Sequence, residues 1–422
     1  MTIDGVVQHV TCLGCGCGCD DVTVTVRQNT IVDAAPVCPL GRSWLGDGRV
    51  PSALVSGGQA ITLEQALRSA AATLIPAKGR CLVYLGADLT SQAQRRALDI
   101  ADFLQATVDS DTSDTAATGL LAAQRRGRAG ATLGEIRNRG DVFLFWGIDP
   151  ADRYPRFLER YSVDPVGTQV PGGRAGRAII GVSVGEDRAL AGANLTLELR
   201  PEEEITALSL LRAAVAGAGV PESPLGTAIR DIAGRLTRAR YVVVVHDAEP
   251  TSQPRSSLRV EGLVALAQTL NGPTRAALCS LRAGGNRVGV ETVLTSHTGY
   301  PFAVEYSRGY PRYQPQMRGI ARLQNGALGA ALVVGSPLFA KSAGGTLSSV
   351  PTVVIGPRAS EVGFTTRVAI DTGVAGIHEG GVAYRMDEVP LELRPPLKGP
   401  RSTADVLAGL SQSLRTAGTS SR

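Results

Sequence analysis

The sequence has few charged residues and no marked excess of either sign. Charged residues make up 19% of the 422 residues, and the net charge is +5. Because the basic residues are also scattered, the chain has no single-sign field of the kind that attracts nucleic acid or a membrane surface. We therefore expect neither as a partner.

Long hydrophobic runs are missing as well. No apolar segment approaches the roughly 18 to 20 residues that span a bilayer, and the N-terminus lacks a basic stretch followed by an apolar run. The expectation that follows is a soluble protein in the reducing cytoplasm.

Phosphate-binding glycine motifs are absent although the chain has 50 glycines. The pairs Gly172-Gly173, Gly284-Gly285 and Gly380-Gly381 lack the spacing and the lysine that a dinucleotide fingerprint or a phosphate loop requires. We interpret these pairs as turns.

The chain does contain a cluster of cysteines near its start. Cys12, Cys15, Cys19 and Cys38 are separated by two, three and eighteen residues. Thiolates this close, with glycines between them, can surround a zinc ion or a [4Fe-4S] cluster. We predict one four-cysteine metal centre with Cys17 left over. Disulfides are the alternative, but nothing else in the sequence indicates a secreted protein.

Short, continuous apolar runs recur along the rest of the chain. Such runs are typical of strands covered on both faces, and hence of parallel sheets with helical crossovers. The runs lie at 81–86, 141–147, 178–182, 241–246, 330–335 and 352–356, and we predict helices near 62–68, 91–104, 202–216, 225–238 and 260–270. The fold prediction is α/β, with doubly wound, mainly parallel sheets and a small N-terminal Cys-rich β region.

The same pattern predicts the domain organisation. We expect a metal-binding β region at 1–55, a discontinuous first α/β domain at 56–150 and 330–395, and a second at 151–329. The tail at 396–422, which begins at the second of two consecutive prolines, is expected to be a surface strap that ends in disorder and contributes no core.

Three further residues have side chains that could act as nucleophiles or ligands, but we expect each of them to have a structural role. Cys81 and Cys279 lie on apolar runs, so we predict that both are small core hydrophobes. His246 follows a parallel strand, and we expect a hydrogen-bonded residue at the strand end instead of a ligand.

A stretch rich in tyrosine, proline and arginine occupies residues 298–315. It holds four of the nine tyrosines and two arginines. On composition it is either a binding rim or an interface loop.

Four motifs in order resemble the B subunit of formylmethanofuran dehydrogenase. They are the cysteine cluster, residues 134–142 leading to 146–150, the tyrosine stretch, and 380–387, so the resemblance extends from Cys12 to about Pro390. It implies the fold of the molybdopterin formate dehydrogenases. In that family the subunit carries a molybdenum or tungsten bis-pterin centre beside a four-cysteine [4Fe-4S] cluster.

Two departures from the family pattern bear on function. The resemblance places Thr115 at the head of the segment where the family has Cys-His-Gly-Pro, whose first residue binds the metal. A hydroxyl is a poor ligand for such a metal, and no cysteine lies between Cys81 and Cys279. The second departure is the Asp-Pro-Arg-x-Thr pattern that holds the pterin dinucleotide, which is absent after Val182. We therefore expect no molybdopterin.

A chain without these parts is similar to the B subunit of the bacterial formyltransferase/hydrolase complex. That complex converts formyl-tetrahydromethanopterin to formate through a methanofuran-type carrier. The resemblance implies a non-catalytic subunit whose partners are a zinc-dependent amidohydrolase subunit, a formyltransferase subunit and a further small subunit. The alternative is an active molybdenum or tungsten formylmethanofuran dehydrogenase.

The resemblance also bears on the metal and on the tyrosine stretch. The family precedent is [4Fe-4S], but a cluster without a redox partner relays no electrons, so the interpretation slightly favours zinc. We predict a contact surface for a partner subunit or for the polyglutamate tail of the carrier, made of Tyr300, Arg308, Tyr310, Arg312 and Tyr313. The competing interpretation is internal packing, with the arginines paired to acids such as Glu305.

Overall fold

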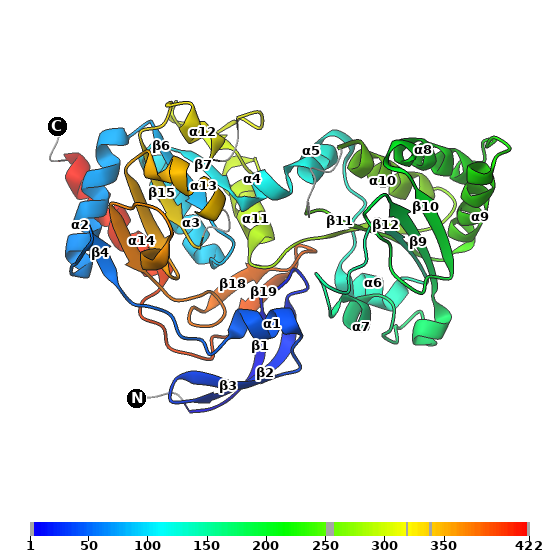
Figure 1. The fold of residues 1–422 in the computed structure, drawn as a ribbon, viewed down its shortest axis with the longest axis horizontal. Helices are drawn as coiled ribbons and strands as arrows, with labels where there is room; N and C mark the ends of the chain where they lie inside the picture. The colour runs from blue at the N-terminus through cyan, green and yellow to red at the C-terminus, as the bar shows by residue number, and fades with distance from the viewer. Residues whose placement is uncertain (1–3, 250–256, 318–319, 337–339, 420–422) are drawn as a thin grey trace. The chain divides into compact units, whose positions relative to one another are not determined.

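The structure is a computed structural model that describes residues 4–249, 257–317, 320–336 and 340–419 (Figure 1). The chain divides into two compact units. Unit 1 comprises Met1–Asp114 and Gly284–Arg422, and unit 2 comprises Thr115–Ala283. Each unit is built around its own sheet, so each is described separately below.

Unit 1 begins with the small antiparallel sheet that the sequence predicts. Its strands are β1 (Gly5–Cys12), β2 (Cys19–Arg27) and β3 (Thr30–Ala35), in the order β1-β2-β3. Val22, Val24 and Val26 alternate along β2 and are buried, because a strand directs every second side chain to the same face. The short helix α1 (Pro39–Leu45) follows directly.

The main sheet of unit 1 has nine strands with a parallel centre. The central order is β7-β6-β15-β16-β17, which in chain order reads 2-1-3-4-5, one of the common doubly wound orders. The direction of strand succession reverses between β6 and β15. These strands are β6 (Cys81–Leu85), β7 (Thr107–Ser110), β15 (Ala330–Val334), β16 (Thr352–Gly356) and β17 (Val368–Asp371). Antiparallel strands extend both edges: β13 (Val304–Glu305) and β14 (Arg312–Tyr313) on one, β4 (Leu54–Ser56) and β5 (Gln59–Ala60) on the other.

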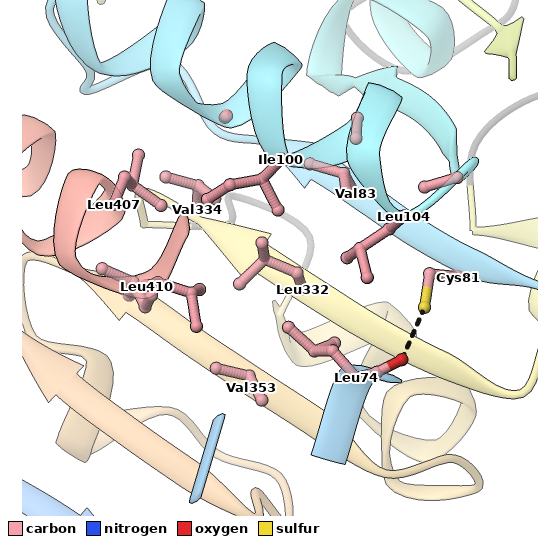
Figure 2. Packing of buried hydrophobic residues seen from close by; sticks show 14 of the residues in the cluster. Leu74, Cys81, Val83, Ile100, Leu104, Leu332, Val334, Val353, Leu407 and Leu410 are labelled. Atoms are coloured by element: carbon pink, nitrogen blue, oxygen red, sulfur yellow. Dashed lines mark hydrogen bonds between the residues drawn. The ribbon is translucent and has the colours of Figure 1, made fainter. Parts of the chain in front are cut away.

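Helices cover both faces of this sheet. Cys81, Val83 and Leu85 point into one hydrophobic cluster, and Leu82 and Tyr84 point into another. The first cluster includes residues of α2 (Leu63–Leu74), α3 (Ser91–Phe103) and α14 (Thr403–Thr419), as Figure 2 shows in part. The second includes residues of α12 (Ala321–Gln324) and α13 (Ala340–Ser348). This arrangement explains why the strands are apolar throughout.

Unit 2 contains a five-stranded sheet that is parallel throughout. Its order, β10-β9-β8-β11-β12, reads 3-2-1-4-5 in chain order, the other common doubly wound order. The strands are β8 (Val142–Trp146), β9 (Ala178–Val184), β10 (Leu195–Leu199), β11 (Val242–Asp247) and β12 (Ala276–Leu281). Helices α8 (Glu204–Val215), α9 (Pro224–Arg238) and α10 (Ser257–Leu270) pack on one face. The predicted α/β class with mainly parallel sheets is confirmed.

The boundaries between the two units differ from the predicted domain boundaries. They lie at 114/115 and 283/284, whereas the sequence analysis predicts 150/151 and 329/330. Strand β8 pairs with β9 and β11, so residues up to 150 do not all join the first sheet. Strand β13 pairs with β7, which returns the chain to unit 1 well before residue 330. Pairing between strands far apart in sequence, which apolar runs do not reveal, decides both boundaries.

The prediction of a C-terminal strap without core is wrong. Residues 403–419 form helix α14, which packs against α2 and α3. Val406, Leu407, Leu410 and Leu414 form an apolar stripe at helical spacing, and all four belong to the main core of unit 1. Figure 2 labels Leu407 and Leu410. The predicted disorder at residues 420–422 lies outside the described residues.

Candidate functional site

The fold of unit 1 brings the four predicted cysteines to one end of the small sheet. The register of β1 and β2 places Cys12 opposite Cys19, and Cys15 lies in the turn between these strands. Cys38 comes from a separate segment as the N-cap of α1. Cys12, Cys15 and Cys19 are buried and Cys38 is partly exposed, and the structure has all seven cysteines as thiols.

The backbone around two of these sulfur atoms is arranged to stabilise negative charge. The Gly14 N–H donates to Cys12 Sγ at 3.4 Å, and the Gly41 N–H donates to Cys38 Sγ at 3.4 Å. Backbone donors of this kind favour the thiolate. A Cβ atom at Gly41 would lie 3.0 Å from Cys12 Sγ and 3.8 Å from Cys38 Sγ, so glycine leaves room for both sulfurs.

Electrostatics also link the four cysteines. Burial is the main cause that raises the pKa of Cys12 to about 12, and charges on Cys19, Cys15 and Cys38 raise it further. The four thiols therefore oppose joint ionisation unless a cation lies among them. The donor set and its shared location fit a metal centre. Among the described residues, no group of three or more His, Cys, Asp or Glu side chains is already arranged to hold a metal ion.

Thr115 lies at the end of α4 (Asp111–Thr115), which follows the carboxyl end of β7. Asp111, Thr112 and Ser113, which precede it on α4, are polar and buried. Ser113 Oγ donates to Asp109 Oδ2 at 3.1 Å, and Thr112 Oγ1 donates to Glu291 Oε1 at 2.8 Å. The sequence has no cysteine between positions 81 and 279 and no histidine between 9 and 246. The segment thus presents hydroxyl and carboxylate oxygens, which do not suit a soft metal.

The segment after β9 does not fit a pterin dinucleotide. Asp187 accepts a hydrogen bond from Arg259 at 2.6 Å, and Arg259 Nε also lies 2.5 Å from Glu204 Oε1. Burial lowers the pKa of Arg259, but the two carboxylates outweigh this effect and raise it. Arg259 is therefore already paired with two carboxylates and does not offer its charge to an anionic diphosphate.

The tyrosine stretch folds as a short hairpin that extends the edge of the nine-stranded sheet. The rings of Tyr300 and Tyr313 stack with their centroids 5.0 Å apart, and Phe302 meets Tyr313 edge-on at 5.4 Å. Tyr300 also packs against the main core of unit 1. These aromatic residues hold the base of the hairpin together.

The two arginines of the stretch have different environments. Arg312 NH2 lies 2.6 Å from Glu305 Oε2 across the strand pair, as the internal-packing interpretation expects. Burial raises the pKa of Glu305, but hydrogen bonds from Ser307 and Arg312 outweigh it, so the pKa falls below its usual range. Arg308 and Tyr310 are exposed in the loop, Tyr310 at 54%. The outward-facing part of the predicted surface is therefore Arg308 and Tyr310.

The structural interpretations of the remaining candidates hold. Cys81 is fully buried, and its thiol donates to the carbonyls of Ala77 and of Leu74, the second of which is drawn in Figure 2. Burial raises the pKa of Cys81 to about 12, which makes it a poor nucleophile. Cys279 is buried within β12. His246 Nε2 shares a 2.8 Å hydrogen bond with Ser280 Oγ on the neighbouring strand.

The sequence analysis missed Asn286. It is fully buried, and its side chain and backbone bind segments near positions 87, 89, 91 and 384. The available signal is the pair Gly284-Gly285 directly before a polar residue, which by itself indicates only a turn.

Comparison with known proteins decides the family. No profile of a known protein family matches the sequence. The chain is 30% identical over 416 residues to the B subunit of the tungsten-containing formylmethanofuran dehydrogenase 2 of Methanococcus maripaludis, covering 94% of this chain and 95% of the relative. The chain belongs to the family of formylmethanofuran dehydrogenase B subunits. The B subunit of the same description from Methanocaldococcus jannaschii is also 30% identical, with 94% of each chain covered.

A solved structure extends this family relationship to a bacterial assembly. The chain resembles a chain of the formyltransferase/hydrolase complex (FhcABCD) of Methylorubrum extorquens, solved in complex with methylofuran, with a TM-score of 0.72 and 26% identity. The match covers 87% of this chain and all of that chain. Among the described residues of this member of the B-subunit family, no helix has the length and apolar character needed to cross a membrane.

Proposed function

We propose that this chain is a non-catalytic subunit of a formyltransferase/hydrolase complex, which converts formyl-tetrahydromethanopterin to formate through a methanofuran-type carrier. The observation that carries the proposal is the segment of hydroxyls and carboxylates that ends at Thr115, the residue that the family resemblance places at the position of the metal ligand. The Arg259 network after β9 supports it, because Arg259 does not offer its charge to the pterin dinucleotide. Without either part the chain has no redox centre of its own.

The partners follow from the same reasoning. The M. extorquens chain comes from a multi-subunit complex that contains methylofuran. By analogy this chain assembles with an amidohydrolase-type zinc subunit, a formyltransferase subunit and a further small subunit. Its role in such an assembly is to hold the catalytic subunits together.

The second candidate is an active molybdenum or tungsten formylmethanofuran dehydrogenase. The observation in its favour is the match to two tungsten-containing relatives over 94% of the chain. This candidate requires a ligand other than Cys or His near Thr115, which is why we favour the non-catalytic role.

We further propose that Cys12, Cys15, Cys19 and Cys38 hold one structural metal centre. Their shared location and the N–H donors to Cys12 and Cys38 support this assignment. Four thiolates can bind zinc or a [4Fe-4S] cluster, and the loss of the neighbouring redox centre favours zinc. The centre would link strands β1 and β2 to helix α1.

Elemental analysis of the purified complex tests both assignments. In the complex we expect no molybdenum or tungsten and no pterin fluorescence after oxidation. Zinc and iron are measured on the full-length chain alone, because the amidohydrolase-type subunit carries zinc of its own, and we expect one four-cysteine centre there, read as one zinc or about four irons. A Cys12→Ser/Cys38→Ser variant should lose the metal, whereas Cys17→Ser, in the same loop, should keep it. Absorption in the visible range would assign iron instead of zinc.

The two assignments fail through different results. Stoichiometric molybdenum or tungsten would overturn the non-catalytic role and leave the cysteine centre standing. Reactive, metal-free thiols at all four cysteine positions of the native protein would overturn the cysteine centre alone.

The exposed tip of the tyrosine hairpin is the proposed contact surface, with Arg308 and Tyr310 as its outward residues. Arginine and tyrosine are enriched at interface positions that contribute most to binding, and a guanidinium offers forked donors to carboxylates of a partner or of a carrier tail. Tyr300, Arg312 and Tyr313 support the hairpin from within.

An Arg308→Ala/Tyr310→Ala variant is expected to weaken complex assembly or carrier-dependent formate release at least tenfold, because truncating an interface anchor costs about 2 kcal/mol or more. Its melting temperature should stay unchanged, since both side chains are exposed. Arg188→Ala, an exposed arginine in unit 2, is the control and should alter neither property. Normal assembly and activity in the double variant would refute the contact surface.

A further inference from the structure

The turn that joins β1 to β2, residues 12–19, is called the cysteine turn below. Its backbone packs against the backbone of the Gly284–Asn286 segment, about 270 residues later in the sequence. The Gly285 N–H donates to the Leu13 carbonyl at 2.8 Å. A Cβ atom at Gly284 would lie 2.6 Å from both the Leu13 and Gly14 carbonyl oxygens. Real Cβ atoms do not approach oxygen this closely, so only glycine at position 284 permits the contact.

Asn286 connects the Gly284–Asn286 segment to the rest of unit 1 by hydrogen bonds. Its backbone N–H donates to the Ala87 carbonyl at 2.5 Å, just beyond the carboxyl end of β6. Its Nδ2 donates to the Leu89 carbonyl at 2.9 Å and to Ser91 Oγ at 3.1 Å. Its Oδ1 accepts from the Tyr384 N–H at 2.7 Å, on β18 (Gly381–Tyr384). A fully buried amide with partners on both ends is costly to replace.

The other end of the cysteine turn is held by the hairpin of β18 and β19 (Pro390–Leu393). The Met386 N–H donates to the Gly16 carbonyl at 3.0 Å. Gly18 lies close to the Leu391 side chain, where a Cβ atom would come within 2.8 Å. Two elements therefore contact the cysteine turn, the Gly284–Gly285 pair and the β18–β19 hairpin. Asn286 is linked to both, to Gly285 through the chain and to Tyr384 by a hydrogen bond.

This junction lies where the order of the nine-stranded sheet reverses. Ala87 follows β6, and β6 and β15 are the two strands on either side of the reversal. Ligands of open α/β sheets bind beyond the carboxyl ends of the strands at such a point. Here the Gly284–Asn286 segment occupies the carboxyl end of β6 and presents its glycines to the cysteine turn.

We propose that Gly284, Gly285 and Asn286 form the positioning clamp of the cysteine centre, with Asn286 as its anchor. The clamp holds the Leu13–Gly14 backbone, and the Gly14 N–H in turn donates to Cys12 Sγ. The clamp thus sets the orientation of the first ligand, although none of its residues binds the metal. The inference deepens the proposed structural centre and rests on it. Partners of this kind typically change metal affinity by about 10- to 100-fold when they are removed.

The test compares zinc release from the full-length chain and its variants, with a chromophoric chelator as the probe. Asn286→Ala is expected to release zinc about 10- to 100-fold faster than the wild type. Asn286→Asp keeps the oxygen that accepts from Tyr384 but replaces the Nδ2 donor with an oxygen that faces the Leu89 carbonyl, so it should also release zinc faster than the wild type. The control is Asn271→Ala in unit 2, an exposed asparagine that loses two donor bonds and one acceptor bond, to Ala267 and Ala276.

A glycine pair provides a second, independent comparison. Gly284→Ala should also speed zinc release, because its methyl group would collide with the Leu13 and Gly14 carbonyls. Gly345→Ala is the control, since a Cβ atom there meets nothing within 4 Å. If Asn286→Ala does not fold, Asn286→Asp and Gly284→Ala decide the question.

The outcomes separate a failed clamp from a failed metal centre. Equal zinc release from the Asn286 and Asn271 variants would overturn the clamp. A wild-type chain that binds neither zinc nor iron would overturn the cysteine centre, and amide hydrogen exchange at residues 12–19 then tests the clamp directly. Faster exchange there in Asn286→Ala than in Asn271→Ala supports the clamp, and equal exchange refutes it.

Discussion

Leu410→Ala is expected to lower the free energy of unfolding by about 2 to 5 kcal/mol, the usual cost of removing a fully buried leucine. Leu410 lies at 0% exposure on α14, among the side chains of the main core in Figure 2. Packing density in a core leaves little freedom for neighbours to fill the resulting cavity. Urea unfolding followed by circular dichroism measures the change.

Leu258→Ala provides the control for this experiment. Leu258 also belongs to a helix, α10, but is 56% exposed, so its truncation should change stability by no more than about 0.5 kcal/mol. If Leu410→Ala behaved like Leu258→Ala, helix α14 would not be part of the core, and the expectation of a C-terminal strap would be restored.

Glu379 is expected to make the protein less stable as the pH rises from about 4.5 to about 7. Burial is the main cause that raises its pKa to about 7, and Asp88 and Asp405 add to the shift. The folded state therefore binds this proton more tightly than the unfolded state, so its stabilising effect is full below about pH 4.5 and is lost as Glu379 ionises. At about 1.36 kcal/mol for each pKa unit, the loss is about 3 kcal/mol.

Glu379→Gln tests this prediction without removing the hydrogen bonds. Oε1 of Glu379 accepts from the Thr403 N–H at 2.6 Å and from Thr403 Oγ1 at 2.8 Å, and a glutamine oxygen can accept both. The variant should be more stable than the wild type at pH 8 and should show a smaller decline between about pH 4.5 and 7. Some decline should remain, because burial also raises the pKa of Asp88. Glu361→Gln, at an exposed site, should leave the curve unchanged. Identical pH profiles for wild type and Glu379→Gln would show the prediction to be wrong.

Much of the α/β architecture is predictable because its signals are local. Buried parallel strands must be apolar on both faces, and the runs at 81–86, 241–246 and 352–356 correspond to β6, β11 and β16. The helix predicted near 62–68 corresponds to α2, and the side chains of Thr62 and Gln65 form a capping box at its start. Both signals lie within a few residues of the element they predict.

The tail shows where local signals mislead the prediction. The prolines at 395 and 396 indicate an extended strap, but the leucines at 407, 410 and 414 have helical spacing and need a partner surface to become core. That surface is formed by α2 and α3, about 300 residues or more earlier in the chain. Nothing near residue 403 indicates that it exists.

The candidate site divides in the same way. The cluster of four cysteines, the absence of a cysteine around Thr115 and the family pattern can be recognised from the sequence alone, because residue identity and spacing are properties of the chain. Only the tertiary structure decided that Arg312 pairs with Glu305 while Arg308 is exposed, and that Asn286 anchors the segment against the cysteine turn. The physical reason is that these residues are brought together by strand order and by packing of one backbone segment against another. Neither feature produces a periodic pattern in the sequence, so a single sequence does not reveal these contacts.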